Sequence, residues 1–382
     1  MIMKKYLLGF AVLAMGMSLM TACSSDDDDD APVLKPVDVS NGMFIVGSGN
    51  TNKGIDGNVS YIDYSKGVTV ANAFKAANGK SVGKTANYGV IYGSKMYIVV
   101  DKEATIWVCD KQTLKVLKQI STTGLLGDKE GKSPRAALGY DGKLYFTCYG
   151  TSEDGSNGIV AAIDTITYAK QQTYAVGSYP DGLTLCGGYI FVANSDYGMN
   201  VKPSISRIDL KSGAVSDIKD AAITNPMQIL TVGNDVYYLD YGTYDESWNQ
   251  TGQGVRKITL DGKVTKLIAG TTMGTDGKRI FSADAPYGKE VNYYIYDTAT
   301  GTTSTWNPAD IFSPAVITAD PVTGNIFVVS YQKNPDKNSA DYALPTYTNQ
   351  YDTTGKFVKK YENTATGAIS VFFNTHTEYV KQ

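Results

Sequence analysis

A short motif that occurs seven times constrains this chain more than any other feature. It is an apolar residue followed by an aromatic one, at spacings of 44 to 53 residues: Met43-Phe44, Met96-Tyr97, Leu144-Tyr145, Ile190-Phe191, Val236-Tyr237, Ile280-Phe281 and Ile326-Phe327. Turn signals such as Asp141-Gly142 and Gly187-Gly188 precede most copies. A repeat of this length built from short strands is the sequence signature of a β-propeller blade.

Each repeat has the pattern of four short strands, A to D, joined by tight turns, and no helical period is visible anywhere. The strand after the aromatic one usually ends in aspartate: Asp63, Asp110, Asp164, Asp209, Asp297 and Asp352. The fifth repeat departs from this pattern, with Lys257–Asp261 in its place. Gly and Tyr, at 39 and 28 residues, fit a chain rich in turns and strands.

The two ends of the repeat region complement one another. The first repeat begins at strand B, Met43–Val46, and lacks strand A. After the last complete repeat, near Tyr361, one more strand-like segment follows at Gly367–Phe373. This segment is expected to become the inner strand of blade one and to remove the open edge. The sequence therefore predicts an all-β, seven-bladed propeller over residues 41–382, instead of the two or three domains that 382 residues suggest.

The N-terminus has the pattern of a lipoprotein signal. Lys4-Lys5 precede an apolar stretch, Tyr6–Met20, that is too short to span a membrane, and Met20–Cys23 forms a lipobox with Met where Leu is commoner. We expect a signal peptide at 1–22, lipidation of Cys23 and a flexible acidic tether at 23–40. The alternative is a secretory peptide with an incidental cysteine. Ser24–Asp30 also resembles the surface-export signal of lipoproteins from one Gram-negative phylum, which implies an outer-membrane protein exposed at the cell surface.

The charge balance argues against nucleic acid as a partner. The chain has 35 basic and 38 acidic residues, and Lys4-Lys5 with the run Asp26–Asp30 account for the whole difference. The remainder is neutral and has no Lys/Arg cluster, whereas nucleic-acid binders usually need a basic surface.

The remaining cysteines and the single histidine match no metal or catalytic motif. Cys109, Cys148 and Cys186 each lie in an apolar strand-like run, so we expect buried free thiols, although an extracellular setting permits disulfides. His376 lies in a polar tail, where a His-based metal site or a Ser-His-Asp triad is not expected.

The long connections between strands B and C are the expected carriers of function. They emerge with the D–A connections at one end of the ring, which we call the loop face, and variable loops on a rigid scaffold commonly bind ligands. Aromatic residues follow strand B at Tyr149, Tyr197, Tyr241, Tyr244, Trp248, Tyr287 and Tyr331. Alternatively, these are ordinary strand-surface residues, because tyrosine favours strands.

Polar residues are expected beside these aromatics. Ten residues before each strand-B aromatic, at the start of strand A, the chain has Asn87, Arg135, Asp181, Met227 and Thr271. Asn87, Arg135 and Asp181, with Asn194 and Asp196 from a B–C loop, complete the predicted ligand-binding set. A wide face with aromatic and amide groups suits a large, flat, amphiphilic ligand.

Several segments resemble the BtuG-type surface lipoproteins, which are YncE-like seven-bladed propellers. They are the lipobox with its acidic tether, Gly47–Asn50, Tyr61–Tyr64, Gly177–Gly182 and Ala193–Gly198. The resemblance implies capture of cobalamin or related corrinoids as a transported ligand, with no resident cofactor. It also implies transfer of the ligand to a BtuB-type TonB-dependent barrel, and attachment to the membrane only through the lipid anchor. A corrinoid brings its own cobalt, so no protein metal ligand or catalytic residue is expected.

Two other classes of function remain open. Some seven-bladed propellers are lyases or hydrolases, which use paired carboxylates or metal-bound histidines, and Asp181, Asp196, Asp240 and Asp284 lie on the expected face. A glycan-binding or partner-scaffold propeller would also use tyrosine and tryptophan platforms. We expect a binding protein and not an enzyme.

Overall fold

The computed structural model describes residues 34–152, 155–195 and 202–381. The predicted signal peptide, Cys23, most of the tether, Asp196 and Tyr197 lie outside these residues. The chain divides into two compact units, one formed by residues 38–377 and the other by residues 1–37 with 378–382. The blades lie within the larger unit, apart from the outer ends of two strands.

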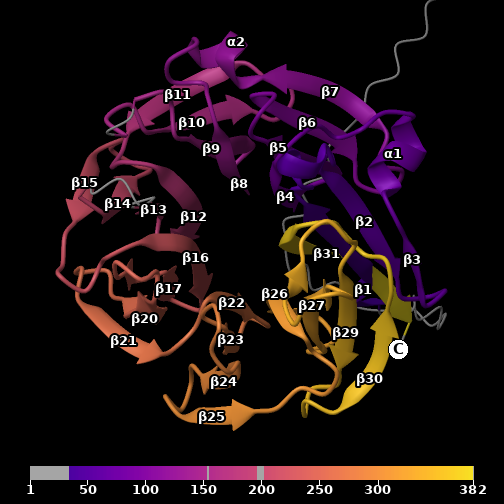
Figure 1. Cartoon of the computed structure of the whole chain (residues 1–382). Helices are drawn as coiled ribbons and strands as arrows, with labels where there is room; N and C mark the ends of the chain where they lie inside the picture. Colours follow the sequence, from indigo (N-terminus) through magenta and orange to yellow (C-terminus); the bar gives the residue numbers. More distant parts are fainter. Residues whose placement is uncertain (1–33, 153–154, 196–201, 382) are drawn as a thin grey trace, which may run out of the picture. The chain divides into compact units, whose positions relative to one another are not determined.

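Seven antiparallel blades form the larger unit in the described residues, each with one strand towards the centre and one at the outside (Figure 1). From the inner strand outwards, blade one has β31 (Ala368–Lys381), β1 (Leu34–Gly47), β2 (Asn58–Asp63) and β3 (Val68–Val70). Blade two has β4 (Ala86–Tyr92), β5 (Lys95–Val100), β6 (Thr105–Asp110) and β7 (Val116–Ser121). Blade three has β8 (Pro134–Tyr140), β9 (Lys143–Cys148), β10 (Ile159–Asp164) and β11 (Lys170–Ala175).

The same order continues through the other four blades. Blade four has β12 (Pro180–Cys186), β13 (Tyr189–Asn194), β14 (Ser204–Asp209) and β15 (Val215–Ile218). Blade five has β16 (Pro226–Val232), β17 (Asp235–Asp240), β20 (Gly254–Ile258) and β21 (Val264–Ile268). Blade six has β22 (Thr272–Thr275), β23 (Arg279–Asp284), β24 (Asn292–Asp297) and β25 (Thr303–Trp306). Blade seven has β26 (Ser313–Ala319), β27 (Ile326–Lys333), β29 (Tyr347–Tyr351) and β30 (Phe357–Tyr361), with β28 (Ala340–Asp341) beside β27.

The predicted fold is confirmed, including the completion of blade one by the C-terminal strand. β31 lies beside β1 in the first sheet. At the loop face, the Ser48 amide donates to the Gly367 carbonyl at 2.8 Å and the Gly49 amide to Thr366 at 3.0 Å. Both strands are longer than predicted. β1 begins at Leu34, inside the expected tether, and β31 continues to Lys381. His376 therefore lies in a strand, with its Nδ1 atom 3.3 Å from the Asn41 amide nitrogen.

Two D–A connections contain short helices, although no helical period is visible in the sequence. α1 (Ala73–Asn78) follows blade one, and α2 (Thr122–Leu126) follows blade two. The Ser121 hydroxyl caps α2 by accepting from the Gly124 amide at 3.0 Å. Helices of five or six residues are too short for a hydrophobic period to be visible in the sequence. A 3-10 turn, η1 (Thr51–Lys53), also lies in the first B–C loop. No helix in the described residues is long and apolar enough to cross a membrane.

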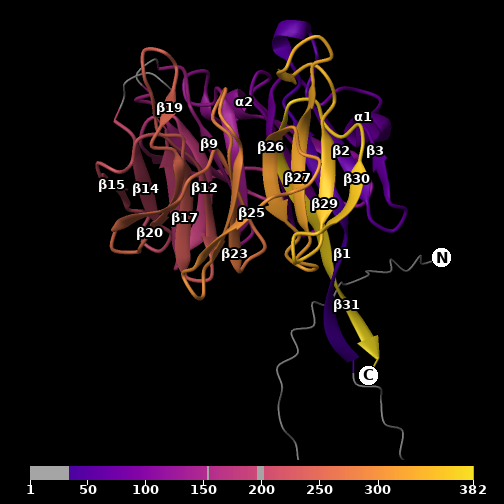
Figure 2. The ribbon, with the colours of Figure 1, turned by 60° about the horizontal axis from the view of Figure 1, so that its bottom comes forward.

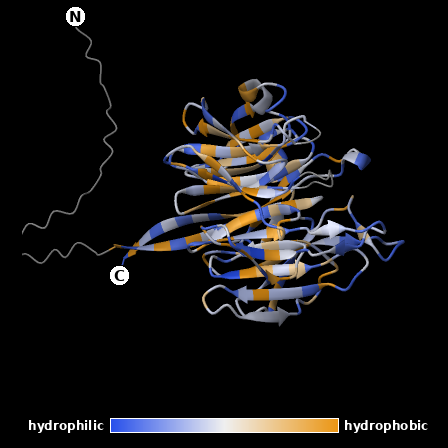
Figure 3. Cartoon of the chain, turned by 90° about the vertical axis from the view of Figure 1, so that its left-hand side faces the viewer, coloured by the Kyte–Doolittle hydropathy of each residue, from blue (hydrophilic) through white to orange (hydrophobic). Residues whose placement is uncertain are grey.

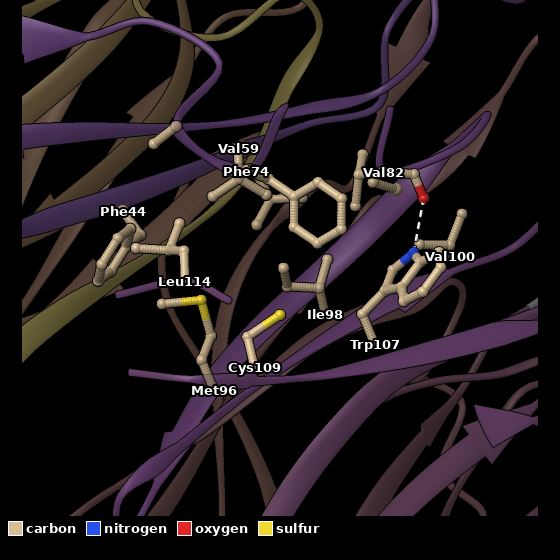
Figure 4. Packing of buried hydrophobic residues seen from close by; sticks show 13 residues of the cluster. Phe44, Val59, Phe74, Val82, Met96, Ile98, Val100, Trp107, Cys109 and Leu114 are labelled. Atoms are coloured by element: carbon tan, nitrogen blue, oxygen red, sulfur yellow. Dashed lines mark hydrogen bonds between the residues drawn. The ribbon is translucent and has the colours of Figure 1, made fainter. Parts of the chain in front are cut away.

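The recurring apolar–aromatic pairs are the core between blades. All fourteen of these residues are at most 3% exposed, and Figure 3 shows hydrophobic residues along the strands. Figure 4 shows the cluster between blades one and two, where Phe44 and Met96 lie with Phe74 of α1 and Trp107 of β6. The Trp107 indole donates to the Val82 carbonyl at 2.8 Å, so the helical connection is fixed to the blade.

The three described cysteines are buried and free, as predicted. Burial raises the pKa of Cys109 to about 12 and also raises the pKa of Cys148 and Cys186. These thiols are therefore protonated and shielded, and they belong to the packing of the blades.

Candidate functional site

A cavity of about 670 Å³ occupies the centre of the ring. All seven inner strands contribute to its wall, and all five residues predicted at the starts of inner strands line it: Asn87, Arg135, Asp181, Met227 and Thr271. Tyr241 and Tyr331, from the roots of two B–C loops, also line it. The volume is within the usual range for a small-molecule site. We call the end of this cavity at the loop face the channel mouth.

A repeated irregularity of the inner strands accounts for the side chains at the mouth. The register with strand B shifts at the start of five inner strands, after Ala86, Pro134, Pro180, Pro226 and Pro314. A bulge leaves a residue out of the ladder and turns its side chain. Asn87, Arg135, Asp181 and Met227 are such residues, and each of them reaches the cavity.

Three of these bulges follow a residue with left-handed backbone: φ is +58° at Thr85, +52° at Ser133 and +46° at Tyr179. Such conformations are unfavourable for residues other than glycine and are held by surrounding contacts. The Tyr149 amide donates to the Ser133 carbonyl at 3.1 Å, and the Ser195 amide donates to Tyr179 at 3.1 Å. The mouth is thus built by backbone that strand B holds in place.

Arg135 is the centre of a polar network that joins three blades. Its Nη1 lies 3.3 Å from Asp101 Oδ2 of blade two, and its Nη2 lies 3.4 Å from Asp181 Oδ2 of blade four. The Tyr149 hydroxyl also donates to Asp181 Oδ2, and the guanidinium carbon lies 4.7 Å from the centre of the Tyr149 ring. These groups form a rigid, hydrogen-bonding wall on one side of the mouth.

Two phenols, Tyr241 of blade five and Tyr331 of blade seven, also line the cavity. Burial raises the pKa of Tyr241 and of Tyr331 to about 12 in each case. Both hydroxyls are therefore protonated at neutral pH and able to donate a hydrogen bond. The Tyr331 ring packs edge-on against Tyr342, with 4.8 Å between ring centres.

Other aromatics of blades five to seven are exposed on the loop face, although they do not line the cavity itself. Tyr244 and Trp248 belong to the hairpin of β18 (Thr243–Tyr244) and β19 (Gln250–Thr251), which stands on the loop face in Figure 2. They are 48% and 80% exposed, Tyr287 in the next B–C loop is 90% exposed, and Tyr342 in the seventh is 53% exposed. Among the described residues, the exposed aromatics of the B–C loops thus belong to blades five to seven, whereas the charged network belongs to blades two to four. The mouth is polar on one side and aromatic on the other.

Three predicted residues stand elsewhere. Tyr149 is buried beneath Arg135 and does not line the cavity. Asn194 has no exposed surface, and its amide donates to the hydroxyls of Ser204 and Ser206 at 2.9 and 2.8 Å. The prediction that it contacts a ligand is therefore corrected, because its amide joins two strands of the blade. Asp240 is also fully buried beside Arg256, so it does not face a ligand.

Two residues of the site were missed by the sequence reasoning. Asp101 follows strand B of blade two at the position that Tyr149 and Tyr241 occupy in their own blades, four residues after the strand-B aromatic. A search of this position for charged residues as well as aromatic ones would have identified Asp101. Tyr342 lies deep in a long loop, where no repeat pattern marks it.

No group of three or more His, Cys, Asp or Glu side chains in the described parts of the chain could hold a metal ion. Asp101 and Asp181 are instead bridged by Arg135, and Asp284 accepts from the Gln253 amide at 3.0 Å. The described mouth offers hydrogen bonds, one guanidinium and aromatic surface to a ligand.

The chain is a β-propeller with a ligand-sized cavity in its central channel. A proposed 6-phosphogluconolactonase of Bacteroides uniformis is similar to it, with 12% identity and a TM-score of 0.59 over 88% of this chain and 100% of that one. One from Bacteroides fragilis has 12% identity and a TM-score of 0.56 over 92% and 100%. Kuenenia stuttgartiensis hydrazine synthase has 15% identity and a TM-score of 0.54 over 78% and 95%. No family model and no curated protein matches the chain. These likenesses show the fold.

Proposed function

We propose that this propeller captures a large amphiphilic small molecule at its loop face, and that the ligand is cobalamin or a related corrinoid. The observation that carries the proposal is the two-sided mouth, with the Arg135 network on one side and the aromatics of blades five to seven on the other. A corrinoid has a broad ring and an edge of amides, so it could use both sides at once. The resemblance of Gly177–Gly182 and other segments to BtuG-type proteins supports this choice.

The same proposal includes the protein's place in the cell. The lipobox at Met20–Cys23 and the acidic run after it support a lipoprotein at the outer-membrane surface. Such a protein would pass its ligand to a TonB-dependent barrel of the BtuB type. A wall of strands held by the Arg135 network is pre-formed, which lowers the ordering cost of binding.

We propose binding without turnover. Enzyme names among the similar structures come with 12% identity, which supports a common fold only. In the mouth itself the carboxylates of Asp101 and Asp181 share the guanidinium of Arg135. We therefore assign these two carboxylates to the structure of the mouth, because both are committed to one guanidinium and Asp181 also accepts from the Tyr149 hydroxyl.

Calorimetric titration of the purified protein with cyanocobalamin tests the proposal. We expect heat of binding, and a red protein after desalting. Trp248→Ala and Tyr287→Ala should each weaken binding about fivefold or more, because each removes exposed aromatic surface. Tyr140→Ala is the matched control: Tyr140 is 41% exposed and lies at the A–B turn of blade three, away from the loop face. Heat with oligosaccharides but none with cyanocobalamin would favour the glycan-binding alternative and contradict the corrinoid.

A further inference from the structure

Blade five contains a buried ion pair beneath its B–C loop. Asp240 is the last residue of β17, and Arg256 lies in the neighbouring strand β20, two residues after Gly254, the register partner of Asp240. Arg256 Nη1 is 3.2 Å from Asp240 Oδ2, and the two side chains are 6% and 0% exposed. Removing both charges from water is costly, so a buried pair of this kind contributes little stability compared with an apolar replacement. Its bonding partners suggest another role.

The Asp240 carboxylate binds two segments at the loop face, the connection that precedes β16 and the loop that follows β17. Its Oδ1 accepts from the backbone amides of Asn225 at 2.9 Å and Gly242 at 2.8 Å, and its Oδ2 accepts from the Thr224 amide at 2.8 Å. Thr224 and Asn225 end the connection that leads into β16 and Met227. Gly242 begins the loop that carries Tyr244 and Trp248.

Arg256 holds the other end of the same loop. Its Nη2 donates to the Gly252 carbonyl at 2.9 Å. Gly242 and Gly252 therefore both bind the ion pair, one through its amide and the other through its carbonyl. At Gly242, with φ at +69°, an added Cβ would lie 2.0 Å from the Thr251 carbonyl oxygen, so the base of the hairpin is closely packed.

We propose that the Asp240–Arg256 pair is a positioning element that sets the hairpin of β18 and β19 on the loop face of blade five. It fixes Tyr241, which lines the cavity, and holds Tyr244 and Trp248 exposed on the loop face. The ligand part of this inference rests on the proposed function, whereas the positioning of the hairpin can be measured without any ligand.

The test uses the full chain with Arg256→Met, which removes the charge and the bond to Gly252. Trp248 supplies the signal, because it is 80% exposed whereas Trp107 is buried and Trp306 is half-buried. A Trp248→Phe protein defines the background from these two. We expect the fluorescence anisotropy of Trp248 to fall, and protease cleavage within residues 242–253 to be about tenfold faster, while circular dichroism remains that of the folded chain.

Arg279→Met is the matched control. Arg279 pairs with Asp276 at 2.8 Å at an A–B turn, so its loss should leave the Trp248 signal unchanged. Arg256→Lys keeps the charge, but a single ammonium group does not contact both Asp240 and the Gly252 carbonyl as the guanidinium does. This variant should give an intermediate anisotropy. This variant serves if Arg256→Met does not fold. Unchanged anisotropy and cleavage in a folded Arg256→Met or Arg256→Lys protein would overturn the proposal.

Titration with cyanocobalamin separates the two proposals. If the wild type binds, Arg256→Met should bind about fivefold or more weakly, and equal affinity would overturn the positioning role. If the wild type does not bind, the corrinoid proposal fails, and the ligand-free anisotropy and cleavage still determine whether the pair positions the hairpin.

Discussion

Arg135 and Asp181 belong to neighbouring blades, and their side chains meet at the channel mouth with Nη2 3.4 Å from Oδ2. The same guanidinium reaches Asp101 of the preceding blade at 3.3 Å. The three side chains are between 11% and 16% exposed. A single residue therefore connects three consecutive blades where water has limited access.

Replacing Arg135 with Met should lower the free energy of unfolding by about 2 kcal/mol, because it leaves two largely buried carboxylates without their cation. Urea denaturation followed by circular dichroism measures this loss. Lys66→Met is the control, since Lys66 pairs with Asp63 at 2.9 Å but is 74% exposed, so its loss should change the free energy of unfolding far less than the loss of Arg135. Equal losses in the two variants would contradict the role given to Arg135.

Acid should destabilise the propeller through its C–D turns. Hydrogen bonds from the Ser65 hydroxyl and Lys66 lower the pKa of Asp63 to about 2, and bonds from Thr113 and Thr300 lower the pKa of Asp110 and Asp297. A pKa below the unfolded value of about 3.9 stabilises the fold above that pH, and the contribution is lost as pH falls through the lowered value.

The melting temperature should thus fall between about pH 4 and pH 2. The triple variant Asp63→Asn, Asp110→Asn and Asp297→Asn should show a shallower fall over that range. Asp336→Asn, in an exposed loop position, should follow the wild type. A triple variant with the full wild-type slope would show that other carboxylates cause the acid sensitivity.

Gly274→Ala should be strongly destabilising. A Cβ on Gly274 of β22 would lie 2.1 Å from the Ile317 carbonyl oxygen of β26 in the next blade. The backbone of β26 cannot move away from this contact unless blades six and seven separate. We therefore expect a loss of about 3 kcal/mol in the free energy of unfolding. Gly124→Ala in α2 is the control, because its nearest neighbours are side-chain atoms of Ser121 at 3.3 Å. A Gly274→Ala protein as stable as this control would contradict the close packing.

The buried thiols should be inert in the folded protein. Cys109, Cys148 and Cys186 are at most 5% exposed. In a Cys23→Ser protein at pH 8, we expect no reaction with dithiobis(nitrobenzoate) until urea unfolds the chain, and then three equivalents. Ser94→Cys, at an exposed turn, should react at once in the folded state and serves as the positive control. Rapid reaction without the added cysteine would contradict the burial.

The repeat predicted the blades well because each strand-B aromatic has the same task of filling the space between neighbouring sheets. The sequence did not predict which loop aromatics are exposed. Tyr149 and Tyr287 both follow strand B, yet they are 6% and 90% exposed. The difference arises from tertiary partners: Tyr149 packs under Arg135 and bonds to Asp181, contacts that no local pattern contains.

The polar part of the site was partly visible in the sequence. Counting back from the aromatic found Arg135 and Asp181, because every inner strand begins at a similar register. The bulges that turn these side chains towards the cavity follow prolines in four blades but Ala86 in another, so composition alone does not mark them. Asn194 looked like a ligand contact, but two nearby serines take its amide hydrogens.

The position of β1 also determines how the domain would respond to a pull. β1 is not an edge strand, since β31 lies on one side of it and β2 on the other, paired from Gly42–Asp63 to Gly47–Asn58. Force applied at the Leu34 end acts along the strand, so many ladder bonds would bear the load together and not break one by one. A chain held at its N-terminal end would therefore be attached through a strand that is paired on both sides.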